Sequence, residues 1–299
     1  MPSNKTTERL NVTEKLRIMN EKYGVKLLAV LLTVHNRKDT TVKCLQCLLA
    51  QRIPEWVQTD IYMVDDGSTD GTGQVVRELF PDVNIIQGDG TLYWNRGMWT
   101  AWETASQNKK YDFFLWLNDD TFLLDNALVE MLTLSRKKND AAVIVGATKA
   151  SESDKLTYGG HTQSGIPECD GVPHEVTIIN GNIVLVPSAV YDKLGNLDYY
   201  YRHGKGDYDY AVRAVKAGIK MYQCGVVLGL CDEHEHIDAW CNPQVPFVKR
   251  WKAMHQPTGM QPLEWFHYEK QLNVCSALFH MLTMYVRCVF PTYWVKRGK

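Results

Sequence analysis

A continuous apolar run rich in β-forming residues, 27–34, constrains the fold of this chain more than any other feature of its sequence. Strands with one face in water alternate apolar and polar residues. This run does not alternate, which is typical of a strand buried on both faces of a parallel sheet. The run ends at three polar residues, His35, Asn36 and Arg37. The chain must therefore supply helices that cover both faces of a sheet.

The segments that follow supply such helices in alternation with further strands. The residue pattern predicts helices over 40–51 and 71–80, and strands over 60–64, 83–87, 113–117 and 142–145. Beyond Thr148 it predicts an extended segment over 176–186, a loop over 199–206, a helix over 208–217 and a strand over 221–230. This alternation predicts an α/β fold with a mostly parallel, doubly wound sheet. Ligands of such sheets bind beyond the carboxyl ends of the strands.

Composition narrows the classes of protein that fit this fold. A length of 299 residues suits one large domain with small appendages. Its 45% apolar and 22% charged residues exclude a disordered chain and a multi-span membrane protein. Because 33 basic residues balance 34 acidic ones, no positive field favours nucleic acid, and we expect no nucleic-acid partner.

The cysteines and the first residues bear on the compartment. Eight cysteines are scattered without a disulfide framework, and the first 23 residues are polar and charged, unlike a secretory signal. Both observations favour reduced thiols in the cytoplasm. Cys44 and Cys47 have the spacing of a redox or zinc motif, but no second pair lies at a matching distance. We interpret them as core residues of a helix.

The apolar tail 272–290 contains a polar stripe whose members follow at alternating spacings of three and four: Asn273, Ser276, His280, Thr283 and Arg287. Residues so spaced line one helix face, and the stripe argues against a helix that crosses a bilayer. Two interpretations are open. The helix packs on the rest of the protein, or it lies in the plane of a membrane surface assisted by the terminal cations Lys296, Arg297 and Lys299.

Two pairs of adjacent acids follow predicted strands. Asp65 and Asp66 precede a glycine-containing turn, where carboxylates can accept hydrogen bonds from the base or ribose of a nucleotide. The alternative for Asp65 is that it caps the turn. Asp119 and Asp120 follow the strand 113–117, and the repulsion between them is most simply offset by a divalent cation such as Mg²⁺ or Mn²⁺.

Four motifs in order resemble the family-two inverting glycosyltransferases of the GT-A fold: TVHNR at 33–37, VDDGSTDGT at 64–72, WLNDD at 116–120 and GDYD at 206–209. The resemblance extends over about 25–236 and points to bacterial enzymes of surface-polysaccharide synthesis, including rhamnosyltransferase-like ones. It implies a GT-A nucleotide-diphospho-sugar transferase fold with a helical C-terminal appendage. It also implies a UDP-, dTDP- or GDP-sugar donor, a saccharide or lipid-linked saccharide acceptor and a bound Mg²⁺ or Mn²⁺.

The resemblance also implies an organisation of the chain. We expect a charged lead-in over 1–24, a catalytic domain over 25–240 and a helical C-terminal segment over 241–299. Within the catalytic domain, the nucleotide half covers about 25–148 and the acceptor half about 149–240. We expect the protein in the cytoplasm, with peripheral contact to the inner face of the cell membrane as the open alternative for its tail.

Matching positions carry the family's roles onto this sequence. Asp207 is implied as the base that takes the proton of the acceptor hydroxyl, and Asp120 and His234 as metal ligands. Nucleotide contacts are implied for Thr33, His35, Arg37, Asp65, Asp66, Asp89, Arg96, Asn118 and Asp119. Contacts to the donor sugar or the acceptor are implied for Trp94, Asn180, Asn182 and Asp209. Asn118 departs from the family's commonest first acid, which leaves Asp119 or a water as its substitute.

Several alternatives stay open at this point. Residues 88–97 resemble a flexible donor loop, whereas Trp99 and Trp102 are interpreted as core. Asp209 also suits a helix cap, and Cys231 with Cys241 fits no usual zinc spacing. A sugar-1-phosphate nucleotidyltransferase would need a glycine-rich basic loop after the first strand, but 32–40 contains no glycine. A catalytically inactive nucleotide- or carbohydrate-binding module is the second rival.

Overall fold

The apolar run forms strand β1 (Lys26–Val34) in the central sheet of the computed structural model, which describes residues 24–233 and 238–295. β1 pairs in parallel with β2 (Val57–Asp66) and β4 (Phe113–Leu117), and β2 pairs in parallel with β3 (Val83–Gly88). Residues 28–32 have no exposed surface, because separate apolar clusters cover the two faces of the sheet. The prediction of a strand buried on both faces is confirmed.

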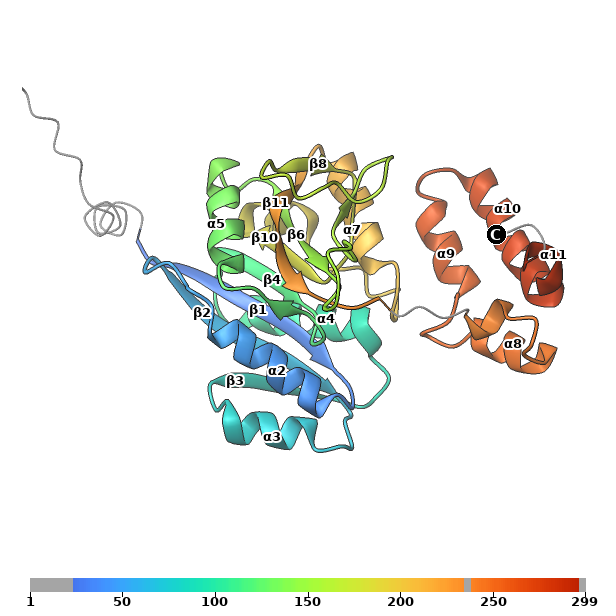
Figure 1. Cartoon of the computed structure of the whole chain (residues 1–299), viewed down its shortest axis with the longest axis horizontal. Coiled ribbons are helices and arrows are strands. Elements are labelled where there is room, and N and C mark those ends of the chain that lie inside the picture. Colours follow the sequence, from blue (N-terminus) through green and yellow to red (C-terminus); the bar gives the residue numbers. More distant parts are fainter. Residues whose placement is uncertain (1–23, 234–237, 296–299) are drawn as a thin grey trace, which may run out of the picture.

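Helices cover both faces of this sheet (Figure 1). One face carries α2 (Lys38–Leu49), α3 (Thr72–Leu79) and α5 (Ala127–Lys137). The other face carries α4 (Tyr93–Asn108), α6 (Ser188–Leu194) and α7 (Gly206–Lys216). Helix α5 was not predicted from the sequence, and residues 88–97 were predicted to form a loop, whereas α4 begins at Tyr93. Trp102 of α4 is completely buried, which confirms its interpretation as a core residue, whereas Trp99 is half-buried and packs against the same apolar cluster.

The second half of the chain completes the same sheet. β10 (Ile183–Pro187) lies antiparallel between β4 and β6 (Val143–Lys149), and β11 (Met221–Leu230) runs parallel to β6. The short strands β5 (Phe122–Leu123) and β8 (His174–Val176) pair with β11, and β7 (Gly160–His161) pairs with β9 (Ile178–Ile179). The strand order β3-β2-β1-β4-β10-β6-β11-β5 therefore interleaves the two predicted halves.

The C-terminal segment is helical, as predicted. It consists of η1 (Ala239–Cys241), α8 (Phe247–Met254), α9 (Pro262–Glu269), α10 (Val274–Val289) and α11 (Pro291–Val295), which gather beside the sheet (Figure 1). These helices share a small core that includes Trp240, Met254 and Met284. No helix within 24–233 and 238–295 is long and apolar enough to cross a membrane.

A loop after α6 joins the C-terminal helices to the sheet. Arg202 in this loop donates from Nε to Glu264 Oε1 of α9 at 2.9 Å, and its backbone oxygen accepts from Asn95 N at the start of α4 at 3.0 Å. Glu264 is almost fully buried, which strengthens an ion pair relative to one in water. The Arg202 loop therefore connects α9 to the first turn of α4.

Candidate active site

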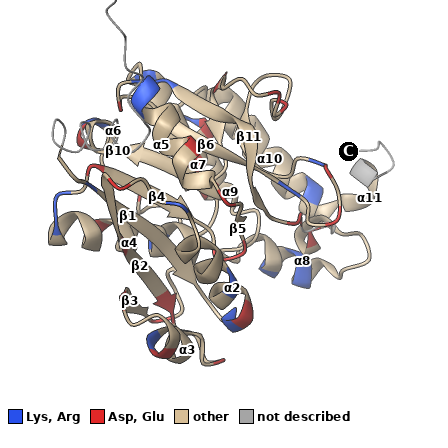
Figure 2. Cartoon of the chain, turned by 60° about the vertical axis from the view of Figure 1, so that its left-hand side comes forward, with Lys and Arg blue, Asp and Glu red and all other residues tan. Residues whose placement is uncertain are grey.

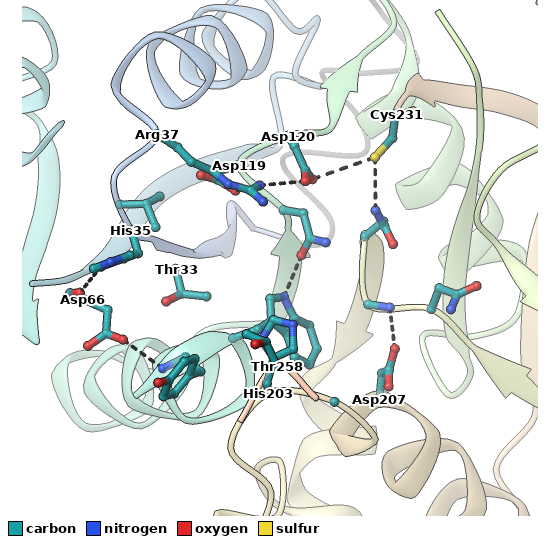
Figure 3. Close-up of a pocket in the computed structure, with 18 of the residues that line it drawn as sticks. Thr33, His35, Arg37, Asp66, Asp119, Asp120, His203, Asp207, Cys231 and Thr258 are labelled. Atoms are coloured by element: carbon teal, nitrogen blue, oxygen red, sulfur yellow. Dashed lines mark hydrogen bonds and ion pairs between the residues drawn. The ribbon is translucent and has the colours of Figure 1, made fainter. Parts of the chain in front are cut away.

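A cavity of about 560 Å³ opens beyond the carboxyl ends of β1, β2 and β4. Thr33 and His35 at the end of β1, Asp66 at the end of β2 and Asp119 and Asp120 after β4 line it together (Figure 3). Ligands of open α/β sheets bind at this edge, so the position of the cavity agrees with the sequence-based expectation.

The structure brings most of the predicted site residues into this one cavity. Its lining contains Thr33, His35, Arg37, Asp66, Trp94, Asn118, Asp119, Asp120, Asn180, Asn182 and Asp207. Asp65, Asp89, Arg96 and Asp209 lie outside the lining. His234 lies outside the described residues, as does nearly all of the predicted lead-in.

One arginine connects the two acids after β4. Arg37 Nη1 lies 3.1 Å from Asp119 Oδ1 and 2.7 Å from Asp120 Oδ2. Asp119 also accepts from Thr41 Oγ1 and is almost fully buried, and this burial raises its pKa to about 6 against the opposing effect of Arg37. The Asp120 side chain is 27% exposed. Of the two carboxylates, Asp120 is the one with access to a ligand.

The acids suit a hard cation in chemical type. Mg²⁺ and Mn²⁺ prefer oxygen donors, and Mg²⁺ typically takes one or two protein carboxylates together with substrate phosphates. Asp120 supplies such a carboxylate on the cavity wall, with Asp119 behind it. Across the described residues, no group of three or more His, Cys, Asp or Glu could by itself hold a metal ion. A cation at Asp120 would therefore need further ligands from bound phosphate or from water.

Asp66 holds the start of α4. Its Oδ1 accepts from Gly90 N at 2.8 Å, and its Oδ2 accepts from Leu92 N at 3.0 Å and Tyr93 N at 2.8 Å. The first N–H groups of a helix lack intrahelical acceptors, so this carboxylate stabilises the helix terminus. Asp66 therefore shapes its side of the cavity through the backbone of residues 90–93, a role that was not predicted from the sequence.

The predicted nucleotide contacts outside the cavity are engaged elsewhere. Asp65 is buried and accepts from Ser68 N at 3.0 Å, which is the turn-capping alternative. Asp89 is exposed and accepts from Thr91 N at 3.0 Å. Arg96 donates from Nε to Tyr199 O at 3.0 Å and lies over the Tyr199 ring, because α4 turns it toward the Arg202 loop. These positions do not support direct contacts with a nucleotide.

Trp94 links the acidic motif to the predicted base. Its indole Nε1 donates to Asn118 Oδ1 at 2.7 Å, and its ring lies against Gly181. Gly181 N in turn donates to Asp207 Oδ2 at 3.0 Å. Asn118 and Asp207, which lie on different sides of the cavity, are thereby held through one rigid aromatic side chain.

We expect Gly181→Ala to disturb this link. A Cβ at position 181 would lie 2.3 Å from Trp94 Cζ2, and the ring is fixed by its bond to Asn118. Overpacking of this kind typically costs about 1–3 kcal/mol. Thermal unfolding should show a lower Tm, and kcat should fall as the Gly181–Asp207 bond loosens. Wild-type Tm and kcat in this variant would contradict the proposed rigidity of Trp94.

Asp207 lies in the first turn of α7 and faces the cavity across from Asp119 and Asp120 (Figure 3). Its Oδ1 accepts from Tyr208 N at 2.8 Å, and its Oδ2 accepts from Gly181 N. Burial raises the pKa of this carboxyl above its usual value, while nearby Lys205 and the backbone N–H groups act in the opposite direction. A fixed carboxylate with a raised pKa is suited to accept a proton.

Asp209 is buried and bonded within the protein, whereas the sequence resemblance implied a contact with sugar. It is 2% exposed, lies 2.8 Å from Arg213 Nε through Oδ2 and accepts from Gln271 Nε2 at 2.6 Å through Oδ1. These partners tie α7 to the segment after α9. The GDYD motif thus separates into a residue at the cavity, Asp207, and a residue that anchors its helix, Asp209.

Several lining residues were assigned no role from the sequence: Tyr93, Tyr158, His203 and Thr258. Tyr93 and His203 contact each other edge to face, with ring centroids 6.4 Å apart. Thr258 belongs to the connection between α8 and α9 and also lines an adjoining cavity of about 220 Å³ with His203 and Trp265. The C-terminal helices therefore contribute directly to the wall of the site.

Cys231 lines the same cavity but does not suit a zinc site. Its Sγ donates to Asp120 Oδ1 at 3.8 Å, and burial, followed by the charge of Asp120, raises its pKa to about 12. Zinc binds the thiolate, which this environment disfavours. Cys241 belongs instead to the core of the C-terminal helices, and Cys44 is buried in α2, as expected for a core residue.

This α/β fold with a cavity at the carboxyl edge of its sheet is that of the GT-A-like transferases. The chain belongs to glycosyl transferase family 2, whose family model matches residues 29–188, more than half of the sequence. Its sequence is 26% identical over 191 residues to a hyaluronan synthase of Streptococcus pyogenes, covering 60% of this chain and 44% of the relative. It is 25% identical over 131 residues to a poly-β-1,6-N-acetyl-D-glucosamine synthase of Staphylococcus epidermidis, covering 44% of this chain and 31% of the relative. The chain thus spans less than half the length of both relatives.

Solved structures support the fold. S. aureus TarS in complex with UDP-GlcNAc aligns with a TM-score of 0.52 and 14% identity, covering 84% of this chain and 72% of that one. GalNAc-T7 with UDP, GalNAc and Mn²⁺ aligns with a TM-score of 0.55 and 12% identity, covering 71% of this chain and 44% of that one.

Proposed function

We propose that this protein is an inverting glycosyltransferase of surface-polysaccharide synthesis that moves a hexosyl or deoxyhexosyl group from a nucleotide-diphosphate donor to a saccharide or lipid-linked saccharide. The observation that carries the proposal is one cavity that joins the acids after β4 to a fixed carboxylate, Asp207, on the facing wall. Membership of glycosyl transferase family 2 supports the reaction class. A role in the cytoplasm, at the inner face of the membrane, is part of the same proposal.

The residues of the two walls divide the reaction between them. Asp207 takes the proton of the acceptor hydroxyl while that oxygen bonds to the anomeric carbon and the bond to the diphosphate breaks, which inverts the configuration. Arg37, Asp119 and Asp120 hold the diphosphate side of the cavity. A divalent cation held by Asp120 would stabilise the negative charge on the departing diphosphate. Trp94 fixes the position of one wall relative to the other through its bond to Asn118.

A UDP-sugar is the first donor to test. The TarS structure contains UDP-GlcNAc and the GalNAc-T7 structure contains UDP with Mn²⁺, and both have folds similar to this one. The sequence resemblance to rhamnosyltransferase-like enzymes makes a dTDP-deoxyhexose the second. His35 lines the cavity with Nδ1 directed at Asp66 O, 2.6 Å away, and Thr33 lies beside it. We expect these residues to contact the base and ribose of either donor.

Release of nucleoside diphosphate from UDP-, dTDP- and GDP-sugars, with and without saccharide acceptors, tests the proposal. We expect one donor class to give release above the level of Asp207→Asn, and a chelator to remove it. Calorimetric binding of a donor without release in any acceptor mixture would instead support the inactive binding module.

A further inference from the structure

The C-terminal helix α10 turns its apolar side outward. Leu278, Leu282, Val286 and Val289 follow one another at spacings of four, four and three, and Phe279 lies three residues before Leu282. All five are exposed, with Phe279 70% and Leu282 59% accessible. A surface helix of a water-soluble domain normally shows the opposite arrangement.

The inward side of α10 explains this orientation, because part of the polar stripe packs there. His280 Nδ1 lies 2.5 Å from Glu269 Oε1 of α9, and the Arg287 guanidinium lies 5.4 Å from the Trp240 ring centre. Small and sulfur-containing residues of α10, Ala277, Met284 and Cys288, are buried on the same side. The helix is therefore fixed by these buried residues together with the contacts of His280 and Arg287, and its apolar side stays uncovered by the described chain.

Helix α8 extends this surface. Phe247, Val248 and Trp251 are exposed, and the Trp251 ring lies 5.5 Å from the Tyr285 ring of α10. Tyr285 is a helical neighbour of Leu282 and Val289, three and four residues away. Arg250 of α8 locks the pair by donating from Nε to Cys288 O at 2.8 Å. We call the exposed apolar residues of α8 and α10 together the apolar face.

The charge of the C-terminal segment indicates which kind of partner the apolar face binds. Residues 241–299 contain eight Lys or Arg and two Glu, although the whole chain has a formal net charge of −1. Lys249 and Lys252 are exposed on α8 beside the apolar residues, and Figure 2 shows these basic segments. Two copies docked through this face would bring their basic segments together, whereas an anionic lipid surface would attract them.

We propose that the apolar face binds an anionic lipid surface, with α8 and α10 lying in the plane of the headgroups. The geometry is that of interfacial helices, which bury apolar side chains at the acyl boundary and keep cations at the rim. The connection between α8 and α9 supplies Thr258 to the cavity, so the site borders the segment that binds lipid. The inference concerns binding alone and does not rest on the proposed sugar transfer.

Vesicle flotation of the full chain tests this inference. We expect wild type to float with phosphatidylcholine vesicles that contain phosphatidylglycerol, to float less at high salt and not to float with phosphatidylcholine alone. Phe279→Ser with Leu282→Ser should lower the apparent partition coefficient by roughly tenfold or more. Lys249→Glu with Lys252→Glu should remove the preference for anionic vesicles. The matched control is Leu49→Ser with Leu79→Ser, two exposed leucines on α2 and α3 that should leave flotation unchanged.

Two further measurements make the result decisive. Circular dichroism should show that both double serine variants stay folded, since all four leucine or phenylalanine side chains are exposed. Sedimentation velocity without vesicles should give the same species for wild type and Phe279→Ser with Leu282→Ser. Absent flotation of wild type, equal flotation of this variant, or a wild-type dimer that the variant abolishes would each overturn the inference, whether or not the protein transfers sugar.

Discussion

The Asp207→Asn variant is expected to bind donor as wild type does but to transfer sugar on the order of 10²–10⁴-fold more slowly. Asparagine keeps the size of the side chain and an oxygen that accepts from Gly181 N, but it lacks a basic oxygen for the acceptor proton. Steady-state kinetics should show the loss in kcat, and calorimetry should show unchanged donor affinity. Normal turnover in a folded Asp207→Asn variant would remove the base from the proposed mechanism.

Asp209→Asn, two residues along α7, provides the contrast. It breaks the pair with Arg213 and alters the bond from Gln271, so we expect a stability loss of roughly 1.5–3 kcal/mol, the range for hydrogen bonds to charged groups. The protein that stays folded should retain most of its turnover. If Asp209→Asn loses turnover with an unchanged Tm, the base has been placed at the wrong acid.

The raised pKa of Asp207 has opposite consequences for the pH dependence of activity and of stability. Because burial raises the folded pKa of Asp207 above its unfolded value of about 3.9, wild-type activity should be lost as the pH falls through that raised pKa. The favourable effect of this group on stability is present below the unfolded pKa and is lost as the pH rises through the folded pKa. The pKa shift by itself therefore predicts no loss of Tm for Asp207→Asn at pH 7, and a fall in Tm would report the bond from Tyr208 N that the amide nitrogen cannot accept.

The sequence predicted the parts of the fold that local pattern determines. The unbroken run of β1 and the polar residues that follow it place Thr33 and His35 at the sheet edge, and the structure has them there. Asp120 and Asp207 are likewise at the cavity because each follows or begins an element whose pattern is readable. Strand order is set by long-range pairing, so the insertion of β10 between β4 and β6 was not predictable from the segments alone.

Roles that depend on partners distant in the chain escaped the sequence. The sequence motif predicted that Asp66 contacts a ligand. In the structure its oxygens accept from backbone N–H groups within residues 90–93, because a helix begins where a loop was predicted. Arg96 was predicted to contact a phosphate, but its position on α4 directs its side chain to Tyr199 O. Thr258 carries no motif at all, and it lines the cavity from the connection between α8 and α9, whose second helix is bonded to the Arg202 loop through Glu264.

The orientation of α10 shows the same limit. Spacing alone identified a polar stripe on one side of the helix, but it did not reveal which side packs inward. In the structure Glu269 and Trp240 draw the stripe inward through His280 and Arg287. Contact partners, and not periodicity, therefore decide whether an amphipathic helix presents its polar or its apolar side.

Asp120→Ala is expected to lower turnover on the order of 10²–10³-fold, the usual cost of deleting one group that stabilises developing charge. Asp120 is the exposed carboxylate of the pair, whereas Asp119 is buried against Thr41 and Arg37, so Asp119 should not replace it. Turnover of wild type should require added Mg²⁺ or Mn²⁺ and vanish with chelator, and calorimetry should show that Mn²⁺ no longer tightens UDP binding in the variant.

Asp125→Ala is the matched control for this change. Asp125 is an exposed acid shortly after β5 and lies outside the cavity lining. Its removal changes the net charge of the protein by the same amount as Asp120→Ala but leaves the site intact. We expect its turnover and its response to Mn²⁺ to equal those of wild type. Full activity of wild type in chelator, together with an active Asp120→Ala variant, would show that no cation is required. Arg37 would then be the positive group opposite the diphosphate, and Arg37→Ala would carry the loss of turnover that is assigned to Asp120.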